Sequence, residues 1–262
     1  MDNIIDFAKK IGNMQPISPI DRDAPRRRPR ASPVMFQRWT DLLFLHWQVP
    51  AESLQPTLPQ GLHLDLYEGN AYVGIVPFFM QAIRPRFLPA VPCLSYFLEL
   101  NVRTYVHDDQ GRPGVWFYSL DTNRWLAYRV ARTAFKLPYQ LAAMSMKQDA
   151  GWTDYRTRRK GEPAASRFRY RSSGEGATAV PGSLEFFLLE RYVLFTESAP
   201  DQIKLGRVHH SPYRYADAET SHFDTHPLEW NHLPLAINRP PDHQCVAEDV
   251  RVEVFPLESA SS

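Results

Sequence analysis

The stretch 97-FLELNVRTYV-106 has the alternation of a β-strand, and its polar positions are the first clue to the fold. Every second position carries a hydrogen-bonding side chain, namely Glu99, Asn101, Arg103 and Tyr105. Because successive side chains of a strand point to opposite faces, these four share one face. The question is whether this face meets solvent, as on an ordinary antiparallel sheet, or lines a polar pocket.

The flanking sequence favours the pocket. The stretches 89-PAVPCLSYFLEL-100 and 113-PGVWFYSL-120 are apolar at odd and even positions alike, as in a strand that is buried on both sides. A glutamate and an arginine in such surroundings have to pair, since burial raises the pKa of a carboxyl group and a nearby cation lowers it. We therefore interpret the polar face as a pocket wall that binds polar atoms of a substrate.

A histidine interrupts another apolar run, 41-DLLFLHWQ-48, which we expect to form a strand. A buried histidine needs a hydrogen-bond partner or a cavity to face. His46 is therefore either a core residue bonded to the backbone or a catalytic residue, and the sequence leaves both open.

The remaining segments predict a mainly antiparallel β protein with few helices. The Glu68-Gly69-Asn70 turn predicts a hairpin over 62–83, and a Gly-rich turn predicts a second one over 96–122. Apolar spacing and Pro138 predict a helix over 124–135, and Ser183 marks the start of another over 183–195. Further strands are expected at 152–161, 166–173, 206–215 and 246–257, the first two with Arg and Tyr on an exposed face.

The chain divides at about residue 33. Residues 1–33 read as a flexible polar leader and 34–262 as a single domain, because no linker follows residue 34. Within the leader, 22-RDAPRRRPR-30 has no interleaved apolar residue, so we expect a solvated tail. Contact between the arginines from Arg26 to Arg30 and an acidic partner is the alternative.

Composition argues against several classes of protein. The 262 residues carry a net charge of +1, which gives no field to attract nucleic acid or an anionic membrane. No apolar run is long enough to span a bilayer, and the first residues do not resemble a secretory signal, so we expect a cytoplasmic protein. The cysteines, Cys93 and Cys245, are too far apart in sequence for a metal clip, and we expect them to be reduced.

Familiar motifs for nucleotide, phosphate or zinc binding and for serine hydrolysis are absent from the sequence. Histidines gather in the C-terminal third, but without a carboxylate at a telling spacing, so we expect no metal site and no cofactor. These histidines are His209, His210, His222, His226, His232 and His243.

Several segments together resemble a known family. The segments are 38-RWTDLLFLHWQVPAESLQPTLPQGLHLD-65, 71-AYVGIVPFFM-80, 98-LELNVRTYV-106, 114-GVWFYSLD-121 and 131-ARTAFKLPYQLA-142. They are similar to the YqjF-like family of uncharacterised proteins (DUF2071), over about 35–255. That family resembles acetoacetate decarboxylase, and the resemblance implies an α+β, mainly antiparallel β fold: a bent β-cone or barrel around an interior pocket, with a few flanking helices.

The resemblance also implies which reaction this chain has lost. The decarboxylase forms a Schiff base through a lysine in a Pro-Lys-Lys motif. In 131-ARTAFKLPYQLA-142, Arg132 and Pro138 match the arginine and proline of the decarboxylase, but Tyr139 and Gln140 occupy the lysine positions. Glu99 matches the strand glutamate of the pocket, and we expect Lys136 at the surface. Schiff-base decarboxylation is therefore not supported.

Two functions remain open. The first is a cofactor-independent, lyase-like enzyme for a small carbonyl or carboxylate compound, with Glu99, Tyr139 and His46 as catalytic residues. Glu99 would be the general acid or base, while Tyr139 and His46 would donate hydrogen bonds to an oxyanion. The second is a non-catalytic small-molecule binding or sensing module. For either function the substrate-binding residues would be Asn101, Arg103, Tyr105 and Arg132, and a homo-oligomer is compatible with both.

Overall fold

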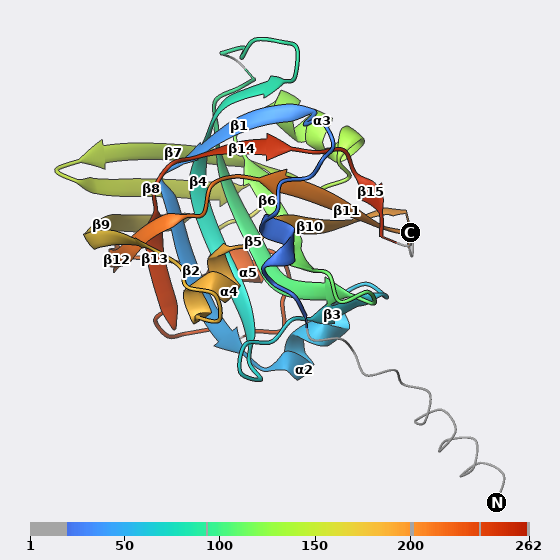
Figure 1. Ribbon diagram of the computed structural model, residues 1–262. Coiled ribbons are helices and arrows are strands. Elements are labelled where there is room, and N and C mark those ends of the chain that lie inside the picture. Colours follow the sequence, from blue (N-terminus) through green and yellow to red (C-terminus); the bar gives the residue numbers. More distant parts are fainter. Residues whose placement is uncertain (1–19, 93, 200–201, 236, 261–262) are drawn as a thin grey trace, which may run out of the picture.

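The computed structural model describes residues 20–92, 94–199, 202–235 and 237–260 (Figure 1). The fold is α+β and mainly antiparallel β, as expected, with short helices at the periphery. The strands are β1 (Met35–Thr40), β2 (Leu42–Val49), β3 (Leu62–Leu64), β4 (Ala71–Pro85), β5 (Phe97–Asp108), β6 (Pro113–Thr122), β7 (Tyr139–Asp149), β8 (Trp152–Arg159), β9 (Ser166–Thr178), β10 (Val193–Ala199), β11 (Gln202–His209), β12 (Arg214–His222), β13 (His243–Ala247), β14 (Val250–Val254) and β15 (Glu258–Ser259). The helices are α2 (Ala51–Leu54), α3 (Trp125–Ala134), α4 (Leu184–Leu189) and α5 (His226–Glu229), with 3-10 turns η1 (Ala24–Arg26) and η2 (Gln55–Thr57).

The sheet closes on itself twice. The first ring runs β1-β14-β11-β10-β6-β5-β4 and closes through the pairing of β4 with β1. The second ring runs β6-β7-β8-β9-β12-β13-β2-β4-β5 and closes through the pairing of β5 with β6. Strands β4, β5 and β6 belong to both rings and lie in the middle of the molecule (Figure 1). These shared strands therefore have an interior on each face.

Strand β5 shows the consequence of this double closure. All of its residues are buried except the half-buried His107, so the predicted burial on both sides is confirmed. Its even-numbered apolar residues, Leu98, Leu100 and Val102, pack with Trp47, Tyr155 and Phe168 in one core cluster. That cluster fills the second ring, and the polar face of β5 points into the first ring.

One predicted hairpin is confirmed and the other is wrong. Strands β5 and β6 pair antiparallel, as the Gly-rich turn indicated. The Glu68-Gly69 turn does reverse the chain, with φ of 50° and 83°, but β3 pairs with β5 rather than with β4. A turn sequence fixes only the local reversal, whereas the neighbours of β4, namely β1, β2 and β5, come from distant segments.

The helix predicted over 124–135 is confirmed as α3, but the one predicted over 183–195 is too long. Ser183 caps α4 as expected, its hydroxyl accepting from the Phe186 amide, yet the helix ends at Leu189 and β10 begins at Val193. Between them, the Glu190 carboxylate accepts from the Tyr213 amide and Arg191 binds Asp65. These two buried charged side chains hold the chain away from the helical path.

The strand boundaries were also partly wrong. The strand predicted over 41–48 is confirmed as β2, whereas β7 was not predicted. The segments 206–215 and 246–257 each contain a break between two strands, after His209 and after Ala247. Each break lets the chain change neighbours: β11 belongs to the first ring and β12 to the second.

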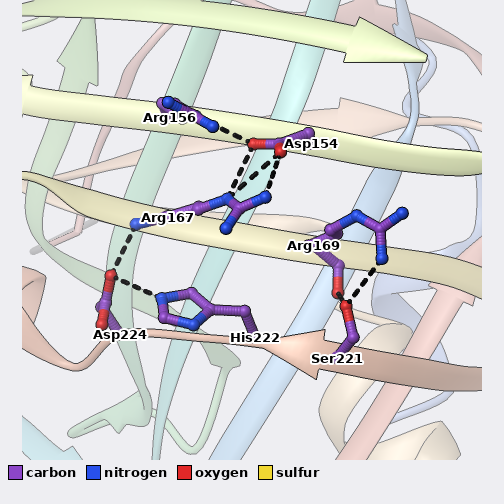
Figure 2. A network of polar contacts seen from close by, with 7 residues as sticks. All are labelled: Asp154, Arg156, Arg167, Arg169, Ser221, His222 and Asp224. Atoms are coloured by element: carbon purple, nitrogen blue, oxygen red, sulfur yellow. Dashed lines mark hydrogen bonds and ion pairs between the residues drawn. The ribbon is translucent and has the colours of Figure 1, made fainter. Parts of the chain in front are cut away.

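The outer face of β8 and β9 carries most of their arginines, as predicted, but the prediction was wrong for the tyrosines and for Arg159: Tyr155, Tyr170 and Arg159 are buried. Figure 2 shows Asp154 of β8 between Arg156 of the same strand and Arg167 of β9. Nearby, the Asp224 carboxylate accepts from the Arg167 amide and contacts His222. The aromatic residues Tyr155, Phe168 and Tyr170 complete the core of the second ring.

The N-terminal segment makes specific contacts where it is described. Arg22 pairs with Asp65, Arg28 donates to Glu253 at 2.6 Å, and Arg26 lies 3.8 Å from Glu190. Residues 1–19 of the expected leader lie outside the described residues, as does Cys93, whereas Cys245 is buried with a free thiol. No helix in the described part of the chain is long and apolar enough to cross a bilayer. The boundary at residue 33 stays a prediction.

Candidate functional site

The first ring encloses a cavity of about 470 Å³. Its wall is formed by residues of β1, β2, β4, β5, β6, β10, β11 and β14, together with the loop after β4, helix α3 and the start of β7. The lining is mostly apolar. The polar exceptions that matter are Glu99, Asn101 and Arg103 of β5, Tyr139 of β7 and Arg191.

Glu99 and Tyr139 form a buried pair in this wall. The Tyr139 hydroxyl donates to Glu99 Oε2 at 2.6 Å. Burial raises the pKa of Glu99 to about 8, although the hydrogen bond from Tyr139 works against this shift, and burial also raises the pKa of Tyr139 well above its ordinary value. Glu99 is therefore a protonated carboxyl group near neutral pH, able to donate a proton as well as to accept a hydrogen bond.

Arg103 is buried without a carboxylate partner among the described residues. Its Nη2 donates to the Tyr105 hydroxyl at 3.2 Å and to the Leu188 carbonyl at 3.1 Å. The guanidinium lies 5.2 Å from the Phe44 ring centre, where a cation–π contact replaces part of its lost hydration. Among the described residues, Nε has no hydrogen-bond partner, and it is covered by neighbouring atoms. This residue of the lining therefore keeps an unused donor.

Two more buried polar groups in the lining are incompletely bonded. Arg191 donates to the Phe187 carbonyl at 2.6 Å and to Asp65 at 2.7 Å, but its Nη2 has no partner. Burial lowers the pKa of Arg191, although Asp65 opposes the shift. The Oδ1 atom of Asn101 is unpartnered as well. A buried polar atom without a partner costs about 1–3 kcal/mol, so its presence calls for an explanation.

Sequence reasoning missed Arg191 as a site residue. The signal was the pair Glu190-Arg191 in the middle of the mostly apolar run 184–195. We assigned that run to one helix, in which Arg191 would have lain on the polar side. In the structure the helix ends two residues before Arg191, and the side chain turns into the interior beside Asp65.

His46 and Tyr105 lie behind the cavity wall rather than in it. The Tyr105 hydroxyl contacts His46 Nε2 at 2.7 Å and the Leu188 carbonyl at 2.9 Å, and His46 Nδ1 contacts His243 Nδ1 at 3.0 Å. Burial lowers the pKa of His46 well below its usual value. His46 thus has side-chain partners on both nitrogens, and it reaches the cavity only through Tyr105 and Arg103. Its catalytic role and the binding role of Tyr105 stay predictions.

A glycine allows this arrangement. Gly74 of β4 lies in register between His46 of β2 and Arg103 of β5. A Cβ at residue 74 would come within 2.9 Å of the His46 ring. Glycine at this position therefore lets the imidazole approach β4 closely and reach Tyr105.

Arg132 is an exposed residue of α3 and does not line the cavity. Its Nη1 donates to the Tyr139 carbonyl at 3.2 Å, so it supports the first residue of β7 from outside. Lys136 is also exposed, and its neighbours Phe135 and Leu137 line the cavity in its place. Among the described residues, no lysine belongs to the lining.

No cluster of three or more metal-ligating side chains occurs in the described ranges. The histidines of the C-terminal third are dispersed: His209 lies on β11, His222 on β12 and His243 on β13. The polar groups at β5, β7 and Arg191 are instead two guanidinium groups, an amide, a phenol and a carboxyl group, and Gln37, Ser95, Arg207 and Tyr213 add further polar groups to the lining. Such a set suits an anionic or carbonyl-bearing organic group.

Comparison with known proteins agrees with this architecture. Residues 36–251 match the family model DUF2071, described as an uncharacterised conserved protein (COG2071). The chain is 39% identical to YqjF of Bacillus subtilis (strain 168) over 187 residues, which are 71% of this chain and 76% of that protein.

Solved structures of similar fold are more distant in sequence. The enduracididine biosynthesis enzyme MppR matches with a TM-score of 0.61 and 12% identity, over 88% of each chain. Acetoacetate decarboxylase from Legionella pneumophila subsp. pneumophila str. Philadelphia 1 matches with a TM-score of 0.58 and 11% identity, over 95% of this chain and all of that one. The chain belongs to the DUF2071 family of YqjF-like proteins, and its fold is that of acetoacetate decarboxylase.

Proposed function

We propose that the cavity binds a small carboxylate or carbonyl compound, held by Arg103, Arg191 and Asn101. The observation that carries the proposal is the set of buried, unpartnered polar atoms on three residues of the lining: Arg103 Nε, Arg191 Nη2 and Asn101 Oδ1. An oxyanion or carbonyl oxygen would accept from the two guanidinium groups, and charge-assisted hydrogen bonds of this kind are short and strong. The hydrogen bonds to a ligand would thus offset the free-energy cost of having removed these groups from water.

Glu99 supports a second step, the transformation of the bound compound by acid–base chemistry. A carboxyl group with a pKa of about 8 is protonated at neutral pH and close enough to it to exchange its proton. Tyr139 would donate to Glu99 or to a developing oxyanion. With a tyrosine at residue 139 and Lys136 exposed, the reaction would proceed without a Schiff base. A binding or sensing module without turnover is the alternative.

Keto acids are the first compounds to test. One structure of MppR, which shares the fold, is titled as a complex with pyruvate. Isothermal titration with a panel of keto, hydroxy and simple carboxylic acids should identify at least one ligand. Arg103→Met should weaken its binding at least about tenfold, the value of one charge-assisted contact. The matched control is Arg156→Met, because that side chain is 61% exposed on the outer face of β8, and its affinity should stay at the wild-type level.

The binding proposal fails if no compound of the panel binds, or if the Arg103 and Arg156 variants bind alike. Turnover is tested separately on any ligand found: Glu99→Gln should abolish its conversion while changing its affinity only a few-fold. A ligand that wild-type protein binds but never converts would favour the binding module. Borohydride trapping with a keto acid should leave no adduct, and an adduct on Lys136 would contradict the Schiff-base-free mechanism.

A further inference from the structure

We infer that the natural ligand is an amphiphile, with an acidic head at Arg103 and Arg191 and an apolar body that extends to the cavity mouth. This inference rests on the proposed function and adds the class of compound to it. It follows from the shape of the cavity and from how polar and apolar residues are distributed along it.

The cavity is long in one direction. Alternate residues of β5 from Phe97 to Arg103 all contribute to its wall. At a rise of about 3.3 Å per residue, these six steps correspond to a length of about 20 Å. A keto acid of pyruvate size would occupy only the end near Arg103 and Asn101.

Apart from Glu99, which pairs with Tyr139, most of the remaining wall is apolar. Much of it consists of buried side chains of one hydrophobic cluster. They include Phe44, Val76, Phe78, Met80, Phe97 and Val208. These side chains have no polar group to offer a ligand, so hydrocarbon is the chemistry that complements them. Each methylene group buried against them contributes about 0.8 kcal/mol, a gain in affinity of about threefold to fourfold.

The mouth is apolar too. Three large apolar residues of the lining are also exposed at the surface: Leu88 at 59%, Val91 at 45% and Leu126 at 42%. Leu88 and Val91 belong to the loop after β4, and Leu126 to the first turn of α3. The cavity therefore opens between this loop and α3. Because the unpartnered donors lie at the buried end and the exposed lining is apolar, the acidic head binds inside and the chain points outward.

A chain-length series tests this inference. Affinities of the full chain for butanoate, octanoate and dodecanoate are measured by isothermal titration, each below its micelle concentration. We expect affinity to rise severalfold or more with each step of the series. Dodecanol, which has the same chain without the acid, should bind at least about tenfold more weakly than dodecanoate.

Two variants assign the ends of the ligand. Leu88→Asp places a charge at the exposed mouth of the cavity. It should lower the affinity for dodecanoate at least about tenfold and leave the affinity for butanoate unchanged. Arg103→Met should lower the affinity for all three acids by a similar factor. Val180→Asp is the control, because Val180 is an exposed apolar residue outside the lining, and it should bind all three acids as wild-type protein does.

The outcomes separate this inference from the proposed function. If butanoate binds and the longer acids bind no better, the cavity takes a small acid and the amphiphile is excluded. If Leu88→Asp leaves dodecanoate unaffected, the assigned direction of the chain is wrong and the inference falls with it. If dodecanol binds as tightly as dodecanoate, or if no acid of any length binds, the acid-binding site is refuted. The proposed function is then refuted as well.

Discussion

Strand β5 and the β8–β9 pair carry the same alternation of polar and apolar residues, but their polar faces have opposite environments. The inward faces of both pack into the core of the second ring. The other face of β5 lines a cavity, while that of β8 and β9 meets solvent. Each polar face holds a carboxyl group, Glu99 in one case and Asp154 in the other.

The two carboxyl groups show what this difference does. Burial raises the pKa of Glu99 to about 8, with only a phenol as its hydrogen-bond partner. The hydrogen bond from Arg167, supported by the one from Arg156, holds the pKa of Asp154 well below its usual range, against the opposing effect of burial. Desolvation decides the first shift and neighbouring cations decide the second. Alternation alone cannot distinguish a reactive carboxyl group from a surface ion pair.

The largest effect should come from Glu99→Gln when stability is measured against pH. The folded pKa of Glu99 lies above its unfolded value of 4.5, so the folded state holds a proton that the unfolded state has lost. This contribution to stability is present in full below the unfolded pKa and is lost as pH rises towards 8. Relative to the Gln variant, wild-type protein should lose about 4 kcal/mol between about pH 5 and pH 8.

Urea denaturation across this range measures the difference. Glutamine keeps an oxygen that can accept from Tyr139, so the two proteins should differ little in acid. Parallel stability curves for wild-type protein and the variant would mean that Glu99 is solvated in the folded state. The contrast between the two carboxyl groups would then be gone.

The next effect concerns the cations of the two faces. Arg103 is buried without a carboxylate partner among the described residues, so Arg103→Met should raise the free energy of unfolding by about 1–4 kcal/mol. Arg167→Met on the outer face removes only a surface ion pair and should lower it by about 1 kcal/mol or less. Opposite signs in denaturant midpoints at neutral pH would support the comparison, and equal losses would contradict it.

The smallest effect is expected for Asp154→Asn. The pKa of Asp154 is lowered on folding, so its contribution is present above the unfolded pKa and is lost as pH falls. The variant should be less stable by about 0.2–1 kcal/mol at neutral pH and equal to wild-type protein in strong acid. Added salt should shrink the gap, because the side chain is 22% exposed and its ion pairs are screened. If molar salt leaves this difference in stability unchanged, the carboxylate of Asp154 is less accessible to solvent than in the structure.

The sequence predicted the wall of the site better than its surroundings. Glu99, Asn101 and Arg103 follow from period-two geometry once β5 is a strand buried on both sides, and Tyr139 came from a motif comparison. Arg191 was not predicted because it lies between α4 and β10, 88 residues after Arg103 in the sequence. The apolar run that contains it does not show where the helix ends. Arg132 matched a motif but lies outside, since its helix faces solvent there.

Local sequence thus determined that this protein is mainly antiparallel β, that Ser183 caps a helix and that β5 is buried on both faces. It did so because alternation, capping and turn chemistry act within a few residues. Only the tertiary structure decided which distant segments complete the cavity beside the polar face of β5 and how large that cavity is. Strand pairing over long distances closes the sheet twice, and the side chains of the second ring fill it while those of the first leave about 470 Å³ open.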